Sequence, residues 1–155
     1  MNKLFFKNKL WNIAIILMIA IFFIGDRYLK YLAISVNNSY KLIGNILTFT
    51  FTPNYFIAFS LPIRGIILES VIFILIVLMA ILFLYLLIKK KITLFFLGLT
   101  AIMLGSISNF LDRLNFGYVI DYLYLKHFTV FNLADALIVL GSIIIFFHIN
   151  KKTDR

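Results

Sequence analysis

Four long apolar runs constrain the fold of this chain more than any other feature. They cover about residues 10–25, 65–88, 92–111 and 128–149. A helix needs about 20 mainly apolar residues to cross a bilayer, and a backbone amide without a partner in lipid is costly enough to make each run helical. Because 63% of the residues are hydrophobic and 14% are charged, the sequence predicts one membrane domain over residues 1–155. We expect an all-α bundle of four transmembrane helices.

Basic residues predict the orientation of the bundle, since segments rich in Lys and Arg tend to stay in the cytoplasm. Six basic residues on one side are spread over longer segments beside aspartates. Nine on the other side cluster against span ends: Lys3, Lys7, Lys9, Lys89, Lys90, Lys91, Lys151, Lys152 and Arg155. We therefore expect both termini in the cytoplasm and the other two connecting segments outside. The first apolar run lacks a small-x-small cleavage site, so we expect it to be retained.

The first outer segment, residues 26–64, is too long for a simple connector. Within it, Asn45–Thr52 alternates in β fashion, with Ile46 and the threonines on one face and Leu47 and two phenylalanines on the other. Tyr118–Leu125, in the second outer segment, is also rich in aromatic and β-branched residues. Together they predict a small extracytoplasmic β-sheet that lies on the membrane surface.

Composition excludes several classes of function. The net charge of +9 does not indicate a nucleic-acid partner, because the basic residues lie between the apolar runs and do not gather on one soluble face. The chain has no cysteine, and its two histidines, His127 and His148, lack the spacing of zinc ligands. We therefore expect no metal and no thiol chemistry.

Four of the six acidic residues fall at or near the outer ends of the spans: Asp26, Asp112, Asp121 and Asp135. A carboxylate at membrane depth costs about 3 kcal/mol even on lenient scales, which makes each one a candidate for a functional site. This segregation is the most informative feature of the sequence.

Two of these aspartates have basic partners nearby. Asp26 and Lys30 are four residues apart, so on a continuing helix they share a face and favour a structural ion pair. Asn109, Asp112 and Arg113 form one helical stripe, on which we interpret Arg113 as a clamp that organises the outer end of the bundle. Asp112 is then a partner and not a catalyst.

Asp121 and Asp135 have no basic residue at helical spacing. Two nearby carboxylates that share one proton supply the base and the acid for peptide hydrolysis. Asn132 lies three residues before Asp135 and could orient the pair or the scissile carbonyl. The structural alternative makes Asp135 a helix-start carboxylate stabilised by the helix dipole.

Three other functions remain to be weighed. A serine–lysine dyad has no supporting spacing, although Lys30 and Lys126 are available as bases. A small proton- or ion-coupled transporter would use the aspartates and Arg113 as a relay, but such proteins place ionisable groups near the midplane, and here even Glu69 is near an outer end. An inactive scaffold is disfavoured because both Asp121 and Asp135 are present.

The chain resembles the prolipoprotein signal peptidases, or signal peptidase II family, over nearly its whole length. Five blocks in the family's order carry the resemblance: Asp26-x-x-x-Lys30; Asn54-x-x-x-Ala58-Phe59; Gly105-x-x-x-Asn109-x-x-Asp112-Arg113; Val119-Ile-Asp121-Tyr122; and Phe131-Asn132-Leu-Ala134-Asp135. Each block alone is a weak signal, whereas five in order are specific.

The resemblance implies an aspartyl endopeptidase of the bacterial cytoplasmic membrane, with its active site on the extracytoplasmic side. The enzyme would remove the signal peptide from diacylglyceryl-modified prolipoproteins by cleaving just before the lipidated cysteine. It would use no cofactor, contact membrane lipid, be inhibited by globomycin-type peptides and act as a monomer. Asp121 and Asp135 would be catalytic, and the supporting residues would be Asp26, Lys30, Asn54, Gly105, Asn109, Asp112, Arg113, Asn132 and Ala134.

The chain departs from the family pattern at three places. Phe56 stands where the outer-loop motif has a glycine, and Ser108 stands where a glycine is common. The separation of Asp121 and Asp135, 14 positions, is short for the family. We expect a reduced loop over the site and an altered conformation near Phe56.

Overall fold

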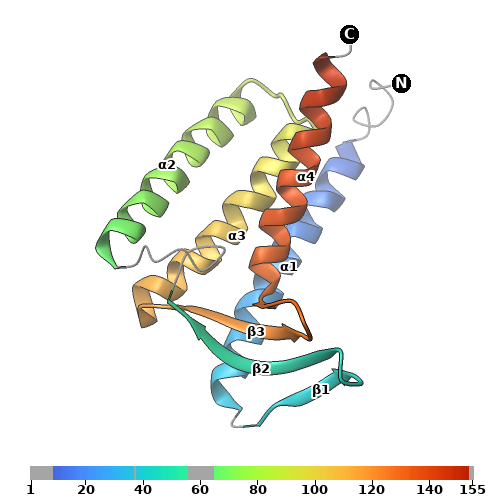
Figure 1. Cartoon of the computed structure of the whole chain (residues 1–155). Helices are drawn as coiled ribbons and strands as arrows, with labels where there is room; N and C mark the ends of the chain where they lie inside the picture. Colours follow the sequence, from blue (N-terminus) through green and yellow to red (C-terminus); the bar gives the residue numbers. More distant parts are fainter. Residues whose placement is uncertain (1–8, 37, 56–64, 154–155) are drawn as a thin grey trace.

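The computed structural model of the chain describes residues 9–36, 38–55 and 65–153, which form four helices and a small sheet at one end of them (Figure 1). The elements are α1 (Lys9–Ser35), β1 (Tyr40–Ile43), β2 (Leu47–Asn54), α2 (Ile66–Ile88), α3 (Leu94–Phe116), β3 (Val119–Leu125), β4 (Val130–Phe131) and α4 (Leu133–Thr153). Helix α1 extends past the sheet, and α2 stands beside α3 (Figure 1).

Three helices in the described part of the chain are long and apolar enough to cross a membrane: Ile66–Ile88, Leu94–Phe116 and Leu133–Lys151. They confirm helices within three of the predicted runs. The first predicted run forms most of α1, and its role as a fourth span remains a prediction.

The ends of two helices differ from the ends of the predicted apolar runs. The last run was expected to be helical from residue 128, but Val130–Phe131 pairs with β3 and α4 begins at Leu133. Helix α3 continues past the third run to Phe116, in agreement with the helical stripe predicted for Asn109, Asp112 and Arg113. The next residue, Gly117, has a positive φ of 78°, the left-handed conformation common after a helix.

The sheet has four antiparallel strands in the order β1-β2-β3-β4. It confirms both predicted strands, although β2 continues to Asn54. Thr52 pairs with Asp121, and the register shifts between Phe49 and Thr52. The simple alternation of faces predicted for β2 is therefore wrong: Leu47–Thr50 are all half-buried, and Ile46 lies in the preceding turn.

Glycines allow α3 and α4 to pack with their backbones close together. A Cβ atom on Gly105 would lie 2.5 Å from the carbonyl oxygen of Ala134. Farther from the sheet, a Cβ on Gly98 would lie 2.8 Å from the carbonyl oxygen of Gly141, and one on Gly141 would lie 2.6 Å from that of Gly98. Small residues permit such approaches between membrane helices. This contact gives Gly105 and Ala134 a structural role at the end of the bundle near the sheet.

The end of the bundle near the sheet also buries polar side chains. Tyr122, Ile120 and Ala33 form a buried cluster between β3 and α1. Around it lie buried polar residues from α1, α3, β3 and the connection between β4 and α4: Asp26, Lys30, Ser108, Asn109, Asp112, Asp121 and Asn132. Buried polar groups are costly unless they are paired, so this region depends on its hydrogen bonds.

Candidate active site

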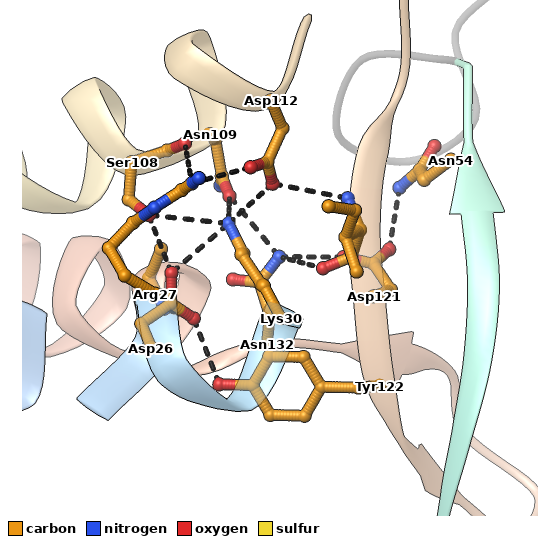
Figure 2. Close-up of polar contacts among 12 residues, drawn as sticks. Asp26, Arg27, Lys30, Asn54, Ser108, Asn109, Asp112, Asp121, Tyr122 and Asn132 are labelled. Atoms are coloured by element: carbon orange, nitrogen blue, oxygen red, sulfur yellow. Dashed lines mark hydrogen bonds and ion pairs between the residues drawn. The ribbon is translucent and has the colours of Figure 1, made fainter. Parts of the chain in front are cut away.

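A cluster of four charged residues joins α1 to α3 (Figure 2). Lys30 Nζ lies 3.1 Å from Asp26 Oδ2 and 2.7 Å from Asp112 Oδ2, and all three side chains are almost fully buried. Arg27 Nη1 contacts Asp112 Oδ1 at 2.5 Å, with 30% of its side chain exposed. The predicted pairing of Asp26 with Lys30 is confirmed. Two cations balance two carboxylates, which such burial requires.

Asp26 also connects α1 to β3 and to the start of α4. Its Oδ1 accepts hydrogen bonds from the Tyr122 hydroxyl at 2.9 Å and from the backbone N–H of Ala134 at 3.1 Å. The Tyr122 hydroxyl in turn accepts from the backbone N–H of Leu133 at 3.0 Å. Burial, followed by the charge of Asp26, raises the pKa of Tyr122, so the hydroxyl keeps the proton that it donates.

Asp121 lies in the middle of β3 and is nearly inaccessible to solvent. Its Oδ2 accepts a hydrogen bond from Asn54 Nδ2 on β2 at 2.9 Å, and its Oδ1 accepts one from Asn132 Nδ2 at 2.7 Å (Figure 2). Burial and then the charge of Asp135 raise the pKa of Asp121 to about 7, against the opposing effects of the two amides and Lys30. A carboxyl group with this pKa can hold a proton at neutral pH.

Asp135 lies in the first turn of α4 and closes a reciprocal cap with Asn132. The backbone N–H of Asn132 donates to Asp135 Oδ2 at 3.2 Å, and the backbone N–H of Asp135 donates to Asn132 Oδ1 at 2.9 Å. This arrangement is a capping box with a shorter acid than usual. Asn109 Nδ2 donates to the other oxygen, Oδ1, at 2.8 Å. The helix-start role foreseen for Asp135 is therefore real, and it leaves the carboxylate half-buried beside Asn132.

Asn132 is the residue on which the two aspartates converge. Its side-chain Nδ2 binds Asp121 and its backbone N–H binds Asp135. The same Nδ2 also lies 3.2 Å from Asn109 Oδ1 and 3.3 Å from the carbonyl oxygen of Ile120. Both aspartates of the predicted pair thus contact Asn132, and the charge of Asp135 acts on Asp121.

Other predicted site residues lie in the same region, with two qualifications. The cations in contact with Asp112 are Arg27 and Lys30, while Arg113 interacts electrostatically with four carboxylates: Asp121, Asp135, Asp112 and Glu69. Its role as a clamp stays a prediction. Three residues of the outer-loop motif lie outside the described residues: Phe56, Ala58 and Phe59.

Sequence reasoning missed three residues of the buried polar network that surrounds the two aspartates. Arg27 was not assigned a role, although it is next to Asp26 in the sequence. Tyr122 was named in a motif block beside Asp121 but was not assigned a role. Ser108 was noted as a departure from a glycine, yet its hydroxyl donates to Asp26 Oδ2 at 2.6 Å. In the part of the chain that the structure covers, no group of three or more His, Cys, Asp or Glu side chains could hold a metal ion.

Comparison with known proteins shows the family of the chain. The sequence model of the family described as signal peptidase (SPase) II matches residues 17–151. The chain belongs to the signal peptidase II family. Membership confirms the resemblance predicted from the five motif blocks and makes the chain a peptidase.

Relatives in the signal peptidase II family cover most of the chain. The lipoprotein signal peptidase of Enterococcus faecalis is 36% identical over 131 residues, which are 80% of each protein. The lipoprotein signal peptidase of Lactobacillus johnsonii is 33% identical over 148 residues, which are 92% of this chain and 93% of the relative.

Two solved structures share the fold of this signal peptidase II family member. Both are described as bacterial membrane enzymes determined by the in meso method, at 2.3 Å and 1.9 Å resolution. The first has a TM-score of 0.74 at 24% identity and covers 99% of this chain and 94% of its own. The second has a TM-score of 0.69 at 25% identity and covers 89% and 91%. The chain therefore has the architecture of a bacterial membrane protein.

Proposed function

We propose that this peptidase removes signal peptides from diacylglyceryl-modified prolipoproteins, with Asp121 and Asp135 as its catalytic pair. Family membership supports the activity and the prolipoprotein substrate. The observation that carries the assignment of the pair is the double contact of Asn132, which binds one oxygen of each carboxyl group. The motif resemblance supports cleavage just before the lipidated cysteine.

The two carboxyl groups divide the work of hydrolysis. Asp135 receives two N–H donors, from Asn109 and Asn132, and lies at the start of α4, where the helix dipole stabilises negative charge. Asp121, whose pKa lies near 7, holds the proton. Asp135 takes a proton from water as the water oxygen attacks the carbonyl carbon, and Asp121 gives its proton to the carbonyl oxygen. When the C–N bond breaks, the proton on Asp135 passes to the leaving nitrogen, and the hydroxyl proton returns to Asp121.

The membrane arrangement is part of the proposal. We infer four spans, with α1 as the fourth, because its apolar run is followed by charged residues that are paired inside the bundle. The beginning of α1, the α2–α3 connection and the end of α4 lie at one end, opposite the sheet (Figure 1). The Lys89–Lys91 triplet lies in that connection, which supports a cytoplasmic location for this end. The site then faces the extracytoplasmic surface, where the lipid anchor of a prolipoprotein would hold the cleavage site at headgroup depth.

The ion-coupled transporter is less well supported. Described acidic side chains lie in the sheet-proximal parts of their helices or in β3, and Lys30 and Arg27 already neutralise Asp26 and Asp112. A relay across the membrane would need ionisable groups along its path.

Cleavage of a diacylglyceryl-modified prolipoprotein by the purified, lipid-reconstituted protein tests the proposal. We expect Asp121→Asn and Asp135→Asn to abolish cleavage while insertion and thermal unfolding stay close to wild type. Asp154→Asn, a carboxylate change at the expected cytoplasmic end, is the control and should cleave normally. Continued cleavage by either dyad variant would remove that residue from the pair.

A further inference from the structure

We propose that Lys30 is a positioning residue that sets the separation between Asp121 and Asp135, an inference that rests on the proposed catalytic pair. The buried ammonium group of Lys30 forms ion pairs with two carboxylates, those of Asp26 and Asp112. Each carboxylate accepts a hydrogen bond from the backbone N–H of the residue just before one of the two proposed catalytic aspartates. Lys30 touches neither aspartate through these contacts, so it would act through their backbones and through Asn109.

The first connection runs from Lys30 to β3. Lys30 Nζ lies 2.7 Å from Asp112 Oδ2, and the same oxygen accepts the backbone N–H of Ile120 at 3.2 Å. Ile120 is buried and directly precedes Asp121. Because Asp112 belongs to α3, this contact fixes the strand against the helix at the position where the Asp121 side chain leaves the backbone.

The second connection runs from Lys30 to α4. Lys30 Nζ lies 3.1 Å from Asp26 Oδ2, and Asp26 Oδ1 accepts the backbone N–H of Ala134 at 3.1 Å. Ala134 is fully buried and directly precedes Asp135. This backbone N–H is in the first turn of α4, where it has no partner within the helix, so Asp26 supplies the acceptor.

The third connection reaches the Asp135 side chain. Lys30 Nζ donates to Asn109 Oδ1 at 2.8 Å, and Asn109 Nδ2 donates to Asp135 Oδ1 at 2.8 Å. The ammonium has no acceptor capacity, so it fixes the amide of Asn109 with its oxygen inward and its NH₂ toward Asp135. The three close acceptors of Lys30, on Asp26, Asp112 and Asn109, match its three hydrogens.

Arg27 provides the natural comparison within the same cluster. It balances the charge of Asp112 as Lys30 does, but its guanidinium contacts Asp112 Oδ1 and Ser108 and is partly exposed. A cluster that served only to neutralise buried charge would respond alike to loss of either cation. A positioning role predicts that Lys30 matters to turnover and that Arg27 matters mainly to stability.

The test compares kcat and KM for Lys30→Gln and Arg27→Gln on a diacylglyceryl-modified prolipoprotein, with kcat corrected for the folded fraction of each variant. We expect Lys30→Gln to lose about 100-fold or more in kcat, because small displacements of catalytic groups have costs of this size. KM should stay within about threefold, since Lys30 contacts the support network and not the substrate. Arg27→Gln should keep kcat within about threefold of wild type.

A second variant keeps the test decisive if Lys30→Gln fails to fold. Asp26→Asn combined with Lys30→Gln leaves Asp112 paired with Arg27, so no buried charge remains alone, and an oxygen stays available for the Ala134 N–H. We expect this double variant to fold and to show the same loss of kcat. Wild-type kcat in either Lys30 variant, or a loss equal to that of Arg27→Gln, would overturn the inference. If Asp121→Asn cleaved normally, the proposed catalytic pair itself would fail, which is a distinguishable result.

Discussion

The side-chain amide of Asn132 lies 2.7 Å from the carboxyl group of Asp121 and joins the start of α4 to the middle of β3. Through its backbone, the same residue caps the helix with Asp135. A single residue therefore caps α4 and contacts both aspartates. Under the proposed catalytic pair, the chemistry and the start of α4 depend on the same hydrogen bonds.

Gly105→Ala should lower both stability and activity. The added methyl group would lie 2.5 Å from the carbonyl oxygen of Ala134, so α3 and α4 must separate where Asn109 holds Asp135. Overpacking of this kind costs about 1–3 kcal/mol. Thermal unfolding in detergent and prolipoprotein cleavage measure the two effects. Gly25→Ala is the matched control, because its nearest neighbour is a side-chain atom at 3.9 Å, and equal losses in the two variants would contradict the close-packing explanation.

Tyr122→Phe should destabilise the junction of β3, α1 and α4. The change removes a buried hydroxyl that donates to Asp26 and accepts from the Leu133 N–H. An unsatisfied buried partner costs about 1–3 kcal/mol, so we expect a loss of that order in the free energy of unfolding. Tyr124→Phe, on the same strand but exposed, should be almost neutral in the same denaturation experiment. A neutral Tyr122→Phe would show that this hydroxyl does not support the site.

The raised pKa of Asp121 predicts how stability depends on pH. An unfolded aspartate has a pKa of about 3.9, so between that value and about 7 the folded protein binds more protons at this position than the unfolded chain does. The contribution of Asp121 to stability should therefore decrease as pH rises through this window. The wild type minus Asp121→Asn difference in unfolding free energy, measured from pH 4 to 8, isolates the effect. A flat difference would mean that Asp121 titrates normally.

Sequence patterns with a local period predicted much of the fold. The spacing of Asp26 and Lys30 predicted their ion pair, an alternating pattern located β2, and aromatic and β-branched residues located β3. The contacts that complete the site are long-range: 108 positions separate Asp26 from Ala134. A repeating pattern in the sequence cannot predict a contact between residues so far apart, which is why the roles of Tyr122 and Ser108 were missed.

Helix ends were the least predictable part of the fold. The spacing of Asp26 with Lys30 and the helical stripe from Asn109 to Arg113 predicted that α1 and α3 continue past their apolar runs, but not where they end. The structure shows both helices continuing, with Lys30 and Asp112 paired between them. Helix α4, in contrast, begins later than its apolar run. The first residues of that run form β4, because Val130 and Phe131 pair with β3. In each case tertiary contacts, which hydropathy does not describe, decide the boundary.

The most direct test of the shared proton is the titration of Asp121 itself, followed by the infrared carboxyl stretch of the reconstituted protein. We predict a protonated carboxyl band that disappears with a midpoint near pH 7, is absent in Asp121→Asn, and moves to lower pH in Asp135→Asn because the neighbouring charge is gone. A midpoint near pH 4 that is unchanged by Asp135→Asn would contradict the account.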